Sequence, residues 1–553
     1  MKWTVNLLLC MILCFSAVSA AQAEEEDRFV IDPQYIDVLH YNYTSNTFNE
    51  GLAWVQLTAS GDMGVIDRAG NLQFDGYDLD PYSHTSYVYS EGLSRVIIDN
   101  HWAYIDRQGH VVLETAYDTV LNFREGLAAV SKNGKWGFID RTGKLVIPLQ
   151  FDEVRDDDGY GISAGTSGFY EGLAAVLKNG KWGFIDHSGK FVIQPKYEWV
   201  GNFSDGLASV TDGDKYGYID KAGREVVPLK YTETLRFSEG IGVVIIPNNN
   251  YYHFAFINKQ GRIVADFKNL YSFVYPLEDG VSIAKYHRGD PTERYVLLDK
   301  TGKVIADLGD RYAEIRSFRE GLAYVYMQNH KMGMIDRSGK EVVEPIYESL
   351  KSSSDGLIAA SLERDSFGFI LNPLDTPSGW AKSEVKAASA LGVIPVDIEY
   401  GYQNDITRAD FSKLALQLFS VKMNKSVDEL LQEAGKTIQG MEITDTYDET
   451  VLAAHALGII NGTGPHKLNP NGFITRQEAA VMLTRVANML HIPAGGKSLF
   501  FTDEALMGSW AKQGIGFIST IKDGTNDAAV MSGVGANNLG RKRRIRRSRR
   551  SLR

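Results

Sequence analysis

Short apolar runs, each ending at a turn signal, fill much of the chain and are clearest in residues 123–154, FREGLAAVSKNGKWGFIDRTGKLVIPLQFDEV. The run 127–130 meets Asn133-Gly134, a dipeptide typical of β-hairpin turns. The run 136–139 ends at the sequence DRTG, with Asp first and Gly fourth as in a type I turn. A third run, 145–147, is stopped by a proline. The pattern predicts a three-stranded β-meander of about 35 residues, with a short fourth strand as an option at its end.

The same pattern recurs along the chain, almost letter for letter at 169–197 and with Tyr216 in place of a tryptophan at 203–231. Successive glycines of the EGL turn are separated by 41, 34, 46, 34, 34, 40, 41 and 35 residues, which is typical of an array or a closed ring. We therefore expect eight to nine units over residues 45–372. The glycines are Gly51, Gly92, Gly126, Gly172, Gly206, Gly240, Gly280, Gly321 and Gly356.

A large apolar residue followed by Gly or Ala stands at the centre of most units. The small residue leaves room for another backbone to approach, and a row of units would share one continuous core. We predict that the large residues are core, while a platform that stacks on sugars is the alternative. The clearest predicted core positions are Trp102, Trp136, Trp182 and Tyr216.

These units resemble the WG-repeat (KWG) family, and the copies at 135–140 and 181–186, KWGFID in both, carry the resemblance. It covers roughly residues 45–372 and implies an architecture rather than one activity. We expect a mainly β repeat array, closed like a β-propeller, because closure would remove exposed strand edges. An open β-solenoid is the alternative that the uneven intervals leave open.

The hydrophobic period changes from two to near 3.6 after a Pro/Gly linker at 373–379, which indicates helices. Two similar helix starts follow. Thr475 with Glu478 forms a capping box, in which the hydroxyl and the carboxylate each satisfy a backbone N–H, and Thr407 with Asp410 forms a weaker version.

The segments ITRAD (406–410) and ITRQE (474–478) resemble the S-layer homology (SLH) family. The resemblance implies a smaller all-α bundle that binds pyruvylated secondary cell wall polysaccharide. We place the first copy at 380–440, the second at 441–498 and a partial third at 499–540. In the first copy, residues 395–401 replace the usual Gly-rich loop. The expected polysaccharide-binding residues are Thr407, Arg408, Asp410, Gly462, Gly464, Thr475, Arg476 and Glu478.

An arginine directly after a helix N-cap is well placed to bind an anionic group of the polysaccharide. It would lie beside unpaired backbone N–H groups and the positive end of the helix dipole. A pyruvyl ketal carries a carboxylate, which a guanidinium can bind through two hydrogen bonds. The alternative is that Arg408 and Arg476 only pair with carboxylates inside the bundle.

Residues 1–23 have a lysine, an apolar run and an A-x-A site, as in a signal peptide, and residues 24–44 would form a lead-in. An uncleaved membrane anchor is the alternative, although the run is short for a span. After cleavage we expect no membrane span. Cys10 and Cys14 both lie in this segment, so the mature chain would have neither disulfides nor thiolate metal sites. An exported, cysteine-free repeat protein is expected to be bacterial, and the resemblance to the S-layer homology family implies the cell wall or cell surface of a Gram-positive bacterium.

The net charge is −11, but residues 541–553, RKRRIRRSRRSLR, hold nine basic groups, so the remainder has 58 − 9 = 49 basic against 69 acidic residues, a net of −20. An acidic body argues against nucleic acid as a partner. The two helix-start threonines lie 68 residues apart, so a third start is due near residue 543, within the basic tail. We expect the tail to be the product of a shifted reading frame, with a disordered cationic arm as the alternative.

No catalytic or metal-binding constellation is predicted. The sequence GISAG at 161–165 fits a nucleophile elbow but lies in a Gly/Ser-rich insertion, and the aspartates at 156–158 lack the ligands of a calcium loop. We therefore expect a non-catalytic binding scaffold with no cofactor, anchored to the wall, whose repeats bind an unidentified protein or glycan. The alternative is a secreted polysaccharide-active enzyme with its site in the repeats.

Overall fold

The computed structural model describes residues 28–38, 48–77, 88–155, 168–248, 251–286, 294–377, 381–402, 404–446, 448–493, 501 and 504–521. The expected signal peptide (1–23), the GISAG insertion, residues 522–540 of the third copy and the basic tail lie outside these residues. The chain divides into two compact units, Met1–Pro373 and Leu374–Arg553. The first is a β-propeller and the second is helical.

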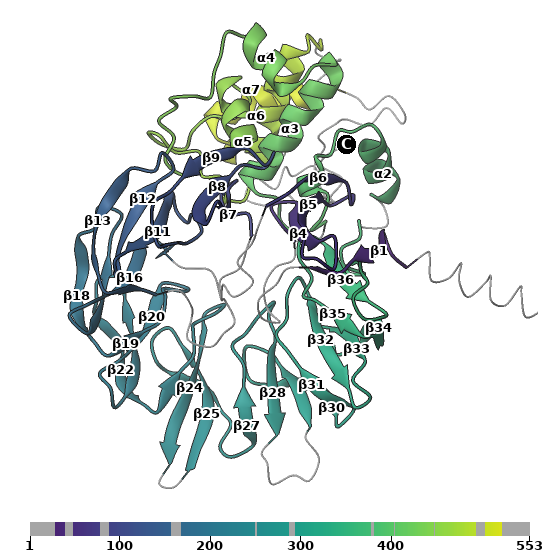
Figure 1. Cartoon of the computed structure of the whole chain (residues 1–553). Helices are drawn as coiled ribbons and strands as arrows, with labels where there is room; N and C mark the ends of the chain where they lie inside the picture. Colours follow the sequence, from purple (N-terminus) through teal and green to yellow (C-terminus); the bar gives the residue numbers. More distant parts are fainter. Residues whose placement is uncertain are drawn as a thin grey trace, which may run out of the picture. The chain divides into compact units, whose positions relative to one another are not determined.

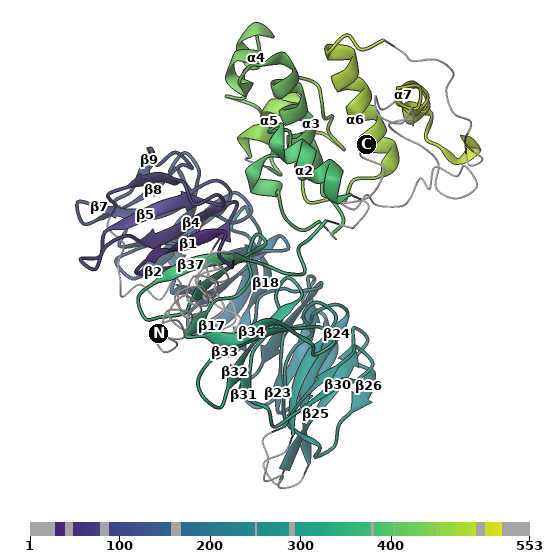
Figure 2. The same cartoon turned by 90° about the vertical axis from the view of Figure 1, so that its right-hand side faces the viewer.

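The first unit is a closed β-propeller of nine blades, so the open-solenoid alternative is wrong (Figure 1). Each blade is an antiparallel sheet, and most have four strands rather than three. The short strand expected at the end of a unit forms, but it pairs with the next unit and becomes the first strand of that blade. Figure 2 shows the same sheets from the side. Blades 1 to 3 contain β2 (Asp37–Val38), β3 (Phe48–Asn49), β4 (Leu52–Gln56), β5 (Met63–Asp67), β6 (Leu72–Asp75); β7 (Ser94–Ile98), β8 (His101–Ile105), β9 (Val111–Glu114); β10 (Thr119–Val120), β11 (Leu127–Lys132), β12 (Lys135–Asp140) and β13 (Leu145–Phe151).

Blades 4 to 6 repeat the arrangement, with the last strand of each blade on the circumference of the ring (Figure 1). Their strands are β14 (Glu153–Val154), β15 (Phe169–Tyr170), β16 (Leu173–Lys178), β17 (Lys181–Ile185), β18 (Phe191–Tyr197); β19 (Trp199–Val200), β20 (Leu207–Thr211), β21 (Tyr216–Asp220), β22 (Glu225–Tyr231); β23 (Glu233–Thr234), β24 (Ile241–Asn248), β25 (Tyr251–Asn258) and β26 (Ile263–Asp266).

Blades 7 to 9 complete the ring, and the last blade takes its outer strand from the start of the chain. Their strands are β27 (Tyr271–Val274), β28 (Ser282–Tyr286), β29 (Tyr295–Leu298), β30 (Val304–Gly309); β31 (Tyr312–Ile315), β32 (Leu322–Met327), β33 (Met332–Asp336), β34 (Glu341–Tyr347); β35 (Ser349–Leu350), β36 (Leu357–Ser361), β37 (Phe367–Leu371) and β1 (Ile31–Tyr35).

Strand β1 closes the ring by pairing antiparallel with β37, with Ile31 opposite Phe369 and Tyr35 opposite Phe367. Part of the expected lead-in is therefore a structural element of blade 9. The sequence could have predicted this strand, because IDPQY at 31–35 resembles IQPKY at 193–197 in the outer strand of blade 4. This pairing ties the start of the chain to the last blade and so holds the two ends of the array together.

The predicted turns form as expected. Asn133 and Gly134 both have positive φ, 52° and 71°, as a two-residue hairpin turn requires. In the next turn the Gly143 N–H donates to the Asp140 carbonyl at 2.9 Å, while the Asp140 carboxylate accepts from the backbone of Thr142 and Lys144. The recurrent aspartates therefore hold their own turns, as the sequence predicted.

In the five blades whose outer strand contains a proline, the glycine after the central large residue has a specific role. A Cβ on Gly137 would lie 2.4 Å from the Ile147 carbonyl oxygen and 2.8 Å from the Pro148 carbonyl carbon, where the outer strand bulges toward it. In blades 2 and 6 the outer strand has no proline and the position is alanine, with Ala103 opposite Glu114 and Ala255 opposite Asp266. The approaching backbone expected from the sequence is thus the outer strand of the same blade.

Neighbouring blades share aromatic pairs and a repeated hydrogen bond. Phe138 of blade 3 packs on Phe169 of blade 4 with ring centroids 5.1 Å apart, and Phe369 of blade 9 packs on Phe48 of blade 1 at the same 5.1 Å. At every interface the acid of one EGL-type turn accepts the N–H of the next turn's glycine. The acids are Glu50, Glu91, Glu125, Glu171, Asp205, Glu239, Asp279, Glu320 and Asp355.

The second unit is a bundle around a core that includes Phe411, Leu416, Ile460, Met482 and Val486. Its helices lie in the region where the hydrophobic period changes, as predicted. They are α2 (Lys382–Ala390), η1 (Val396–Ile398), α3 (Arg408–Met423), α4 (Val427–Glu433), α5 (Glu449–Ala456), α6 (Arg476–Met489), η2 (Glu504–Leu506) and α7 (Ser509–Ile518).

Candidate functional site

Both predicted helix starts are capping boxes. In α3 the Asp410 N–H donates to Thr407 Oγ1 at 3.1 Å, and the Thr407 N–H donates back to the Asp410 carboxylate at 3.4 Å. In α6 the Thr475 N–H donates to Glu478 Oε2 at 2.9 Å, and the Glu478 N–H donates to Thr475 Oγ1 at 3.4 Å. Two otherwise unpaired donors are satisfied in each case, which fixes where each helix begins.

The two helix starts lie side by side. The Ile474 N–H donates to the Ile406 carbonyl at 3.1 Å, and Thr407 forms an isolated β-bridge with Phe473. The first amides of α3 donate to the second copy, Arg408 N to the Gly472 carbonyl at 2.8 Å and Ala409 N to the Pro470 carbonyl at 3.0 Å. The expectation of unpaired N–H groups at this helix start is therefore wrong for α3, because the loop of the next copy covers them.

Arg408 lies inside the bundle, with 5% of the residue exposed. Its Nε donates to the Leu468 carbonyl and its Nη2 to the Asn461 carbonyl, each at 3.0 Å, and its Nη1 pairs with Glu478 at 2.5 Å. The guanidinium thus joins the first copy to both ends of the 461–468 loop and to the start of α6. A charge this buried is tolerated because it is paired and hydrogen-bonded.

The loop that Arg408 holds is also fixed from its other side. The Asp445 carboxylate accepts the Leu468 and Asn469 N–H groups, each at 2.8 Å. A Cβ on Gly462 would lie 2.9 Å from the Lys467 carbonyl oxygen, whereas nothing lies within 4 Å of one on Gly464. Of the two predicted loop glycines, only Gly462 is therefore required by the packing.

Arg476 opens α6 as Arg408 opens α3, and it is 7% exposed. Helix α7 of the third copy packs beside it, where the Gly508 N–H donates to the Gln477 side-chain oxygen at 3.0 Å and Thr484 Oγ1 donates to the Gly514 carbonyl at 2.9 Å. These contacts place the face of α6 that carries Gln477 and Thr484 at the boundary between the second and third copies.

Lys413 is a buried charge that sequence reasoning missed. Its ammonium pairs with Asp397 at 2.7 Å and with Asp448 at 2.5 Å. Burial alone would lower the pKa of Lys413, but the two carboxylates outweigh it and raise the pKa. The sequence does not predict this ion-paired lysine, because a lysine in an amphipathic helix is ordinarily expected to face solvent.

The four predicted core aromatics stand at the end of a central strand in their blades. Trp182 is 5% exposed, while Trp102, Trp136 and Tyr216 are half-buried. The lysine before Trp136 and the lysine before Trp182 each pair with an acid seventeen positions further on, Lys135 with Asp152 at 2.6 Å and Lys181 with Glu198. The WG motif is thus part of the architecture of the blade.

Known protein families match segments of both units. The family described as "WG containing repeat" matches residues 102–136, 136–163, 165–182, 182–216, 216–251, 297–329 and 332–363. The S-layer homology domain matches residues 442–480. The first unit is thus a β-propeller that contains seven WG repeats. The second unit contains one S-layer homology domain.

The curated relatives match only part of the chain. The exoglucanase XynX of Acetivibrio thermocellus is 26% identical over 142 residues, which are 25% of this chain and 12% of that protein. The amylopullulanase of Thermoanaerobacterium thermosulfurigenes is 26% identical over 142 residues, 25% of this chain and 7% of that protein. The chain thus spans only a small part of either relative.

Among solved structures, BamB from Moraxella catarrhalis is similar at a TM-score of 0.31 and 11% identity, over 53% of this chain and 98% of that chain. A similarity this low carries no argument about function. S-layer homology domains bind cell wall polysaccharides in general, so this domain points to the cell surface or cell wall. Within the described residues no helix is long and apolar enough to cross a membrane, and no group of three or more His, Cys, Asp or Glu side chains is placed to hold a metal ion.

Proposed function

We propose that this protein is exported by a Gram-positive bacterium and held at its wall by the S-layer homology region, while the propeller serves as a non-catalytic binding scaffold. The wall ligand is a pyruvylated secondary polysaccharide, bound without a covalent bond. The observation that carries the proposal is the ITRQE start of α6, which lies inside the matched segment 442–480 and has its capping box formed.

Arg476 is the main ligand-binding group in this proposal. Arg408 already donates to Glu478 and to the carbonyls of Asn461 and Leu468, so its role is to hold the loop beside the site. A guanidinium at the first position of a helix can bind a carboxylate through two hydrogen bonds, with the helix dipole adding to the attraction.

Sedimentation with purified walls tests the anchor. The full chain should sediment with intact walls and lose most of this binding when mild acid has removed the pyruvyl ketals from the polysaccharide. Equal binding to both wall preparations would contradict recognition of the ketal carboxylate. No binding to either would contradict the anchor itself.

Incubation with wall glycans tests the absence of catalysis. The full chain should release no new reducing ends from peptidoglycan, wall polysaccharide, xylan or β-glucan. Release that disappears on substitution of one aspartate or glutamate of the propeller would show that the repeats are an enzyme instead.

A further inference from the structure

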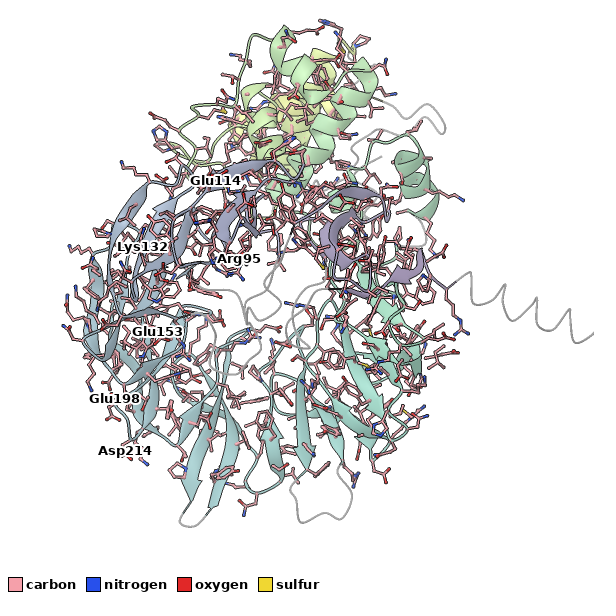
Figure 3. The ribbon with its side chains drawn as sticks, in the orientation of Figure 1. Arg95, Glu114, Lys132, Glu153, Glu198 and Asp214 are labelled. Carbon is pink, nitrogen blue, oxygen red and sulfur yellow. The ribbon has the colours of Figure 1, made fainter. Side chains whose placement is uncertain are left out.

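The inner strands of four consecutive blades present either an aromatic side chain or a carboxylate at one equivalent position. Trp199, Glu233, Phe273 and Glu314 are each followed by a fully buried residue, and each pair faces the next strand of its blade in the same register. Because successive side chains of a strand point to opposite faces, these four share an orientation. Glu153 of blade 4, labelled in Figure 3, holds the same position opposite Leu177.

This position is not fixed by the repeat. The blade architecture explains the residues that recur in nearly every unit, such as the turn aspartate and the acid of the EGL turn. The inner-strand position instead varies, with Asp37, Thr119 and Ser349 in other blades. Phe273 is 38% exposed, and Trp199 and Glu233 are half-buried, so solvent reaches them. Residues that vary and stay accessible on a fixed frame are candidates for binding.

Trp199 is held in place by its surroundings. The Tyr216 ring lies 6.0 Å away in an edge-on arrangement, and the Arg155 guanidinium lies 4.7 Å from the indole centroid. Gly201 lies beside the ring, where a Cβ would be in ordinary van der Waals contact with Trp199 Cη2 at 3.5 Å. The indole is therefore a fixed flat surface with a cation next to it.

Phe273 has a comparable environment two blades further on. The Tyr275 ring lies 4.6 Å away at 64°, and the Phe254 ring lies 5.7 Å away at 58°. Glu314, in the following blade, accepts from Arg316 Nε at 2.6 Å. We define Arg155, Trp199, Tyr216, Glu233, Phe273 and Glu314 as the inner-rim cluster.

We propose that the inner-rim cluster binds a neutral oligosaccharide, which deepens the proposed role of the propeller as a binding scaffold. Aromatic faces pack against the C–H faces of pyranose rings, and the carboxylates between them accept hydrogen bonds from hydroxyl groups. Along the rim, aromatic residues alternate with acids from blade to blade: Trp199, Glu233, Phe273 and Glu314. The carboxylates disfavour a polyanion such as nucleic acid, and Arg155 disfavours a cationic peptide.

The test uses the full chain and oligomers of four to six sugar units from β-1,4-glucan, β-1,4-xylan and β-1,4-linked N-acetylglucosamine. At least one oligomer should change the tryptophan fluorescence and give a dissociation constant by calorimetry. Trp199→Ala and Phe273→Ala should each weaken that binding about tenfold or more, the loss expected for one stacked ring. Tyr252→Ala, which removes an aromatic side chain 58% exposed outside the cluster, is the matched control and should bind like the parent chain.

Trp199→Phe is the control for a folding defect, because it keeps an aromatic ring at this position. It should bind the oligomer more tightly than Trp199→Ala, and its melting temperature should equal that of the parent chain. Arg476→Ala separates this site from the wall anchor, because it should lose wall sedimentation and keep oligosaccharide binding. Failure of all three oligomers to bind would overturn the proposal. Unchanged affinity of Trp199→Ala would also overturn it, as would binding of a lysine-rich peptide in place of the oligomers. None of these results would change the conclusion about wall anchoring by the S-layer homology region.

Discussion

The Asp355 carboxylate accepts a hydrogen bond from the Gly51 N–H at 2.8 Å, although 304 residues of chain separate them. The contact joins blade 9 to blade 1 and is the last member of a ring of equivalent bonds between successive blades. Arg68 Nε donates to the Asp355 carbonyl at 2.8 Å, which adds a second link across the same interface. Ring closure therefore depends on the same contact as every other interface, in addition to the pairing of β1 with β37.

Asp355→Ala should destabilise the propeller by about 1–3 kcal/mol, because it leaves a buried N–H without its acceptor. Urea unfolding followed by tryptophan fluorescence measures the loss. Asp355→Asn is the matched control and should cost less, since its amide oxygen can still accept from Gly51. Equal stability of Asp355→Ala and the parent chain would show that the strand pairing alone closes the ring.

Gly137→Ala should destabilise blade 3 by about 1–3 kcal/mol, because its Cβ would enter the space of the Ile147 carbonyl oxygen. The reciprocal change Ala103→Gly, in a blade without the outer-strand proline, should cost only about 0.5–1 kcal/mol through backbone entropy. Thermal unfolding of the two variants compares them. A Gly137→Ala protein as stable as Ala103→Gly would contradict the proposed role of the glycine.

Gly462→Ala should lower both the melting temperature of the helical unit and its binding to walls, because the loop held by Arg408 must move to admit the methyl group. Gly464→Ala is the control two residues away and should change neither, since its Cβ would meet nothing within 4 Å. If both variants lose wall binding without a change in stability, the loop contacts the ligand directly at both positions.

Arg476→Ala should weaken wall sedimentation more than Arg408→Ala when both are compared at equal folded fraction. Arg408→Ala should instead cost about 3 kcal/mol or more of stability, because it leaves Glu478 Oε1 and two loop carbonyls without the Arg408 donor. Added salt should weaken the binding of the parent chain, since the contact is partly ionic. Unchanged wall binding by the double variant would show that both arginines are structural.

Stability of the interface between blades 3 and 4 should fall in acid. Burial would raise the pKa of Glu125, but its hydrogen bond and charge interaction with His187, 3.2 Å away, and the Gly172 N–H lower it below the usual 4.5. The stabilisation is therefore present above pH 4.5 and is lost as the pH falls through the lower folded value.

His187→Phe tests this pH dependence because it keeps a ring to stack on Phe169, whose centroid lies 4.1 Å from that of His187, while removing the donor to Glu125. Urea midpoints measured from neutral pH down to about pH 3 should fall less steeply in this variant than in the parent chain. Parallel curves would show that the His187–Glu125 pair adds nothing to acid sensitivity.

The sequence by itself determined the local structure of both units. Alternating apolar runs and turn residues predicted the meander, and the turns at Asn133-Gly134 and Asp140 formed as expected. The capping boxes at Thr407 and Thr475 also fixed two helix starts correctly. Such features are readable because all the interacting groups lie within a few residues of one another in the chain.

Only the tertiary structure decided which distant groups meet. The pattern allowed eight or nine units and either a ring or an open row, and closure depends on β1 pairing with β37 across the whole array. Likewise Arg408 and Arg476 stand in the same local sequence, yet the contact of Arg408 with Glu478 depends on how two copies pack. Local patterns record that a residue is buried or that a strand forms. They do not record the partner, because pairing is settled by the shape and charge of surfaces that only folding brings together.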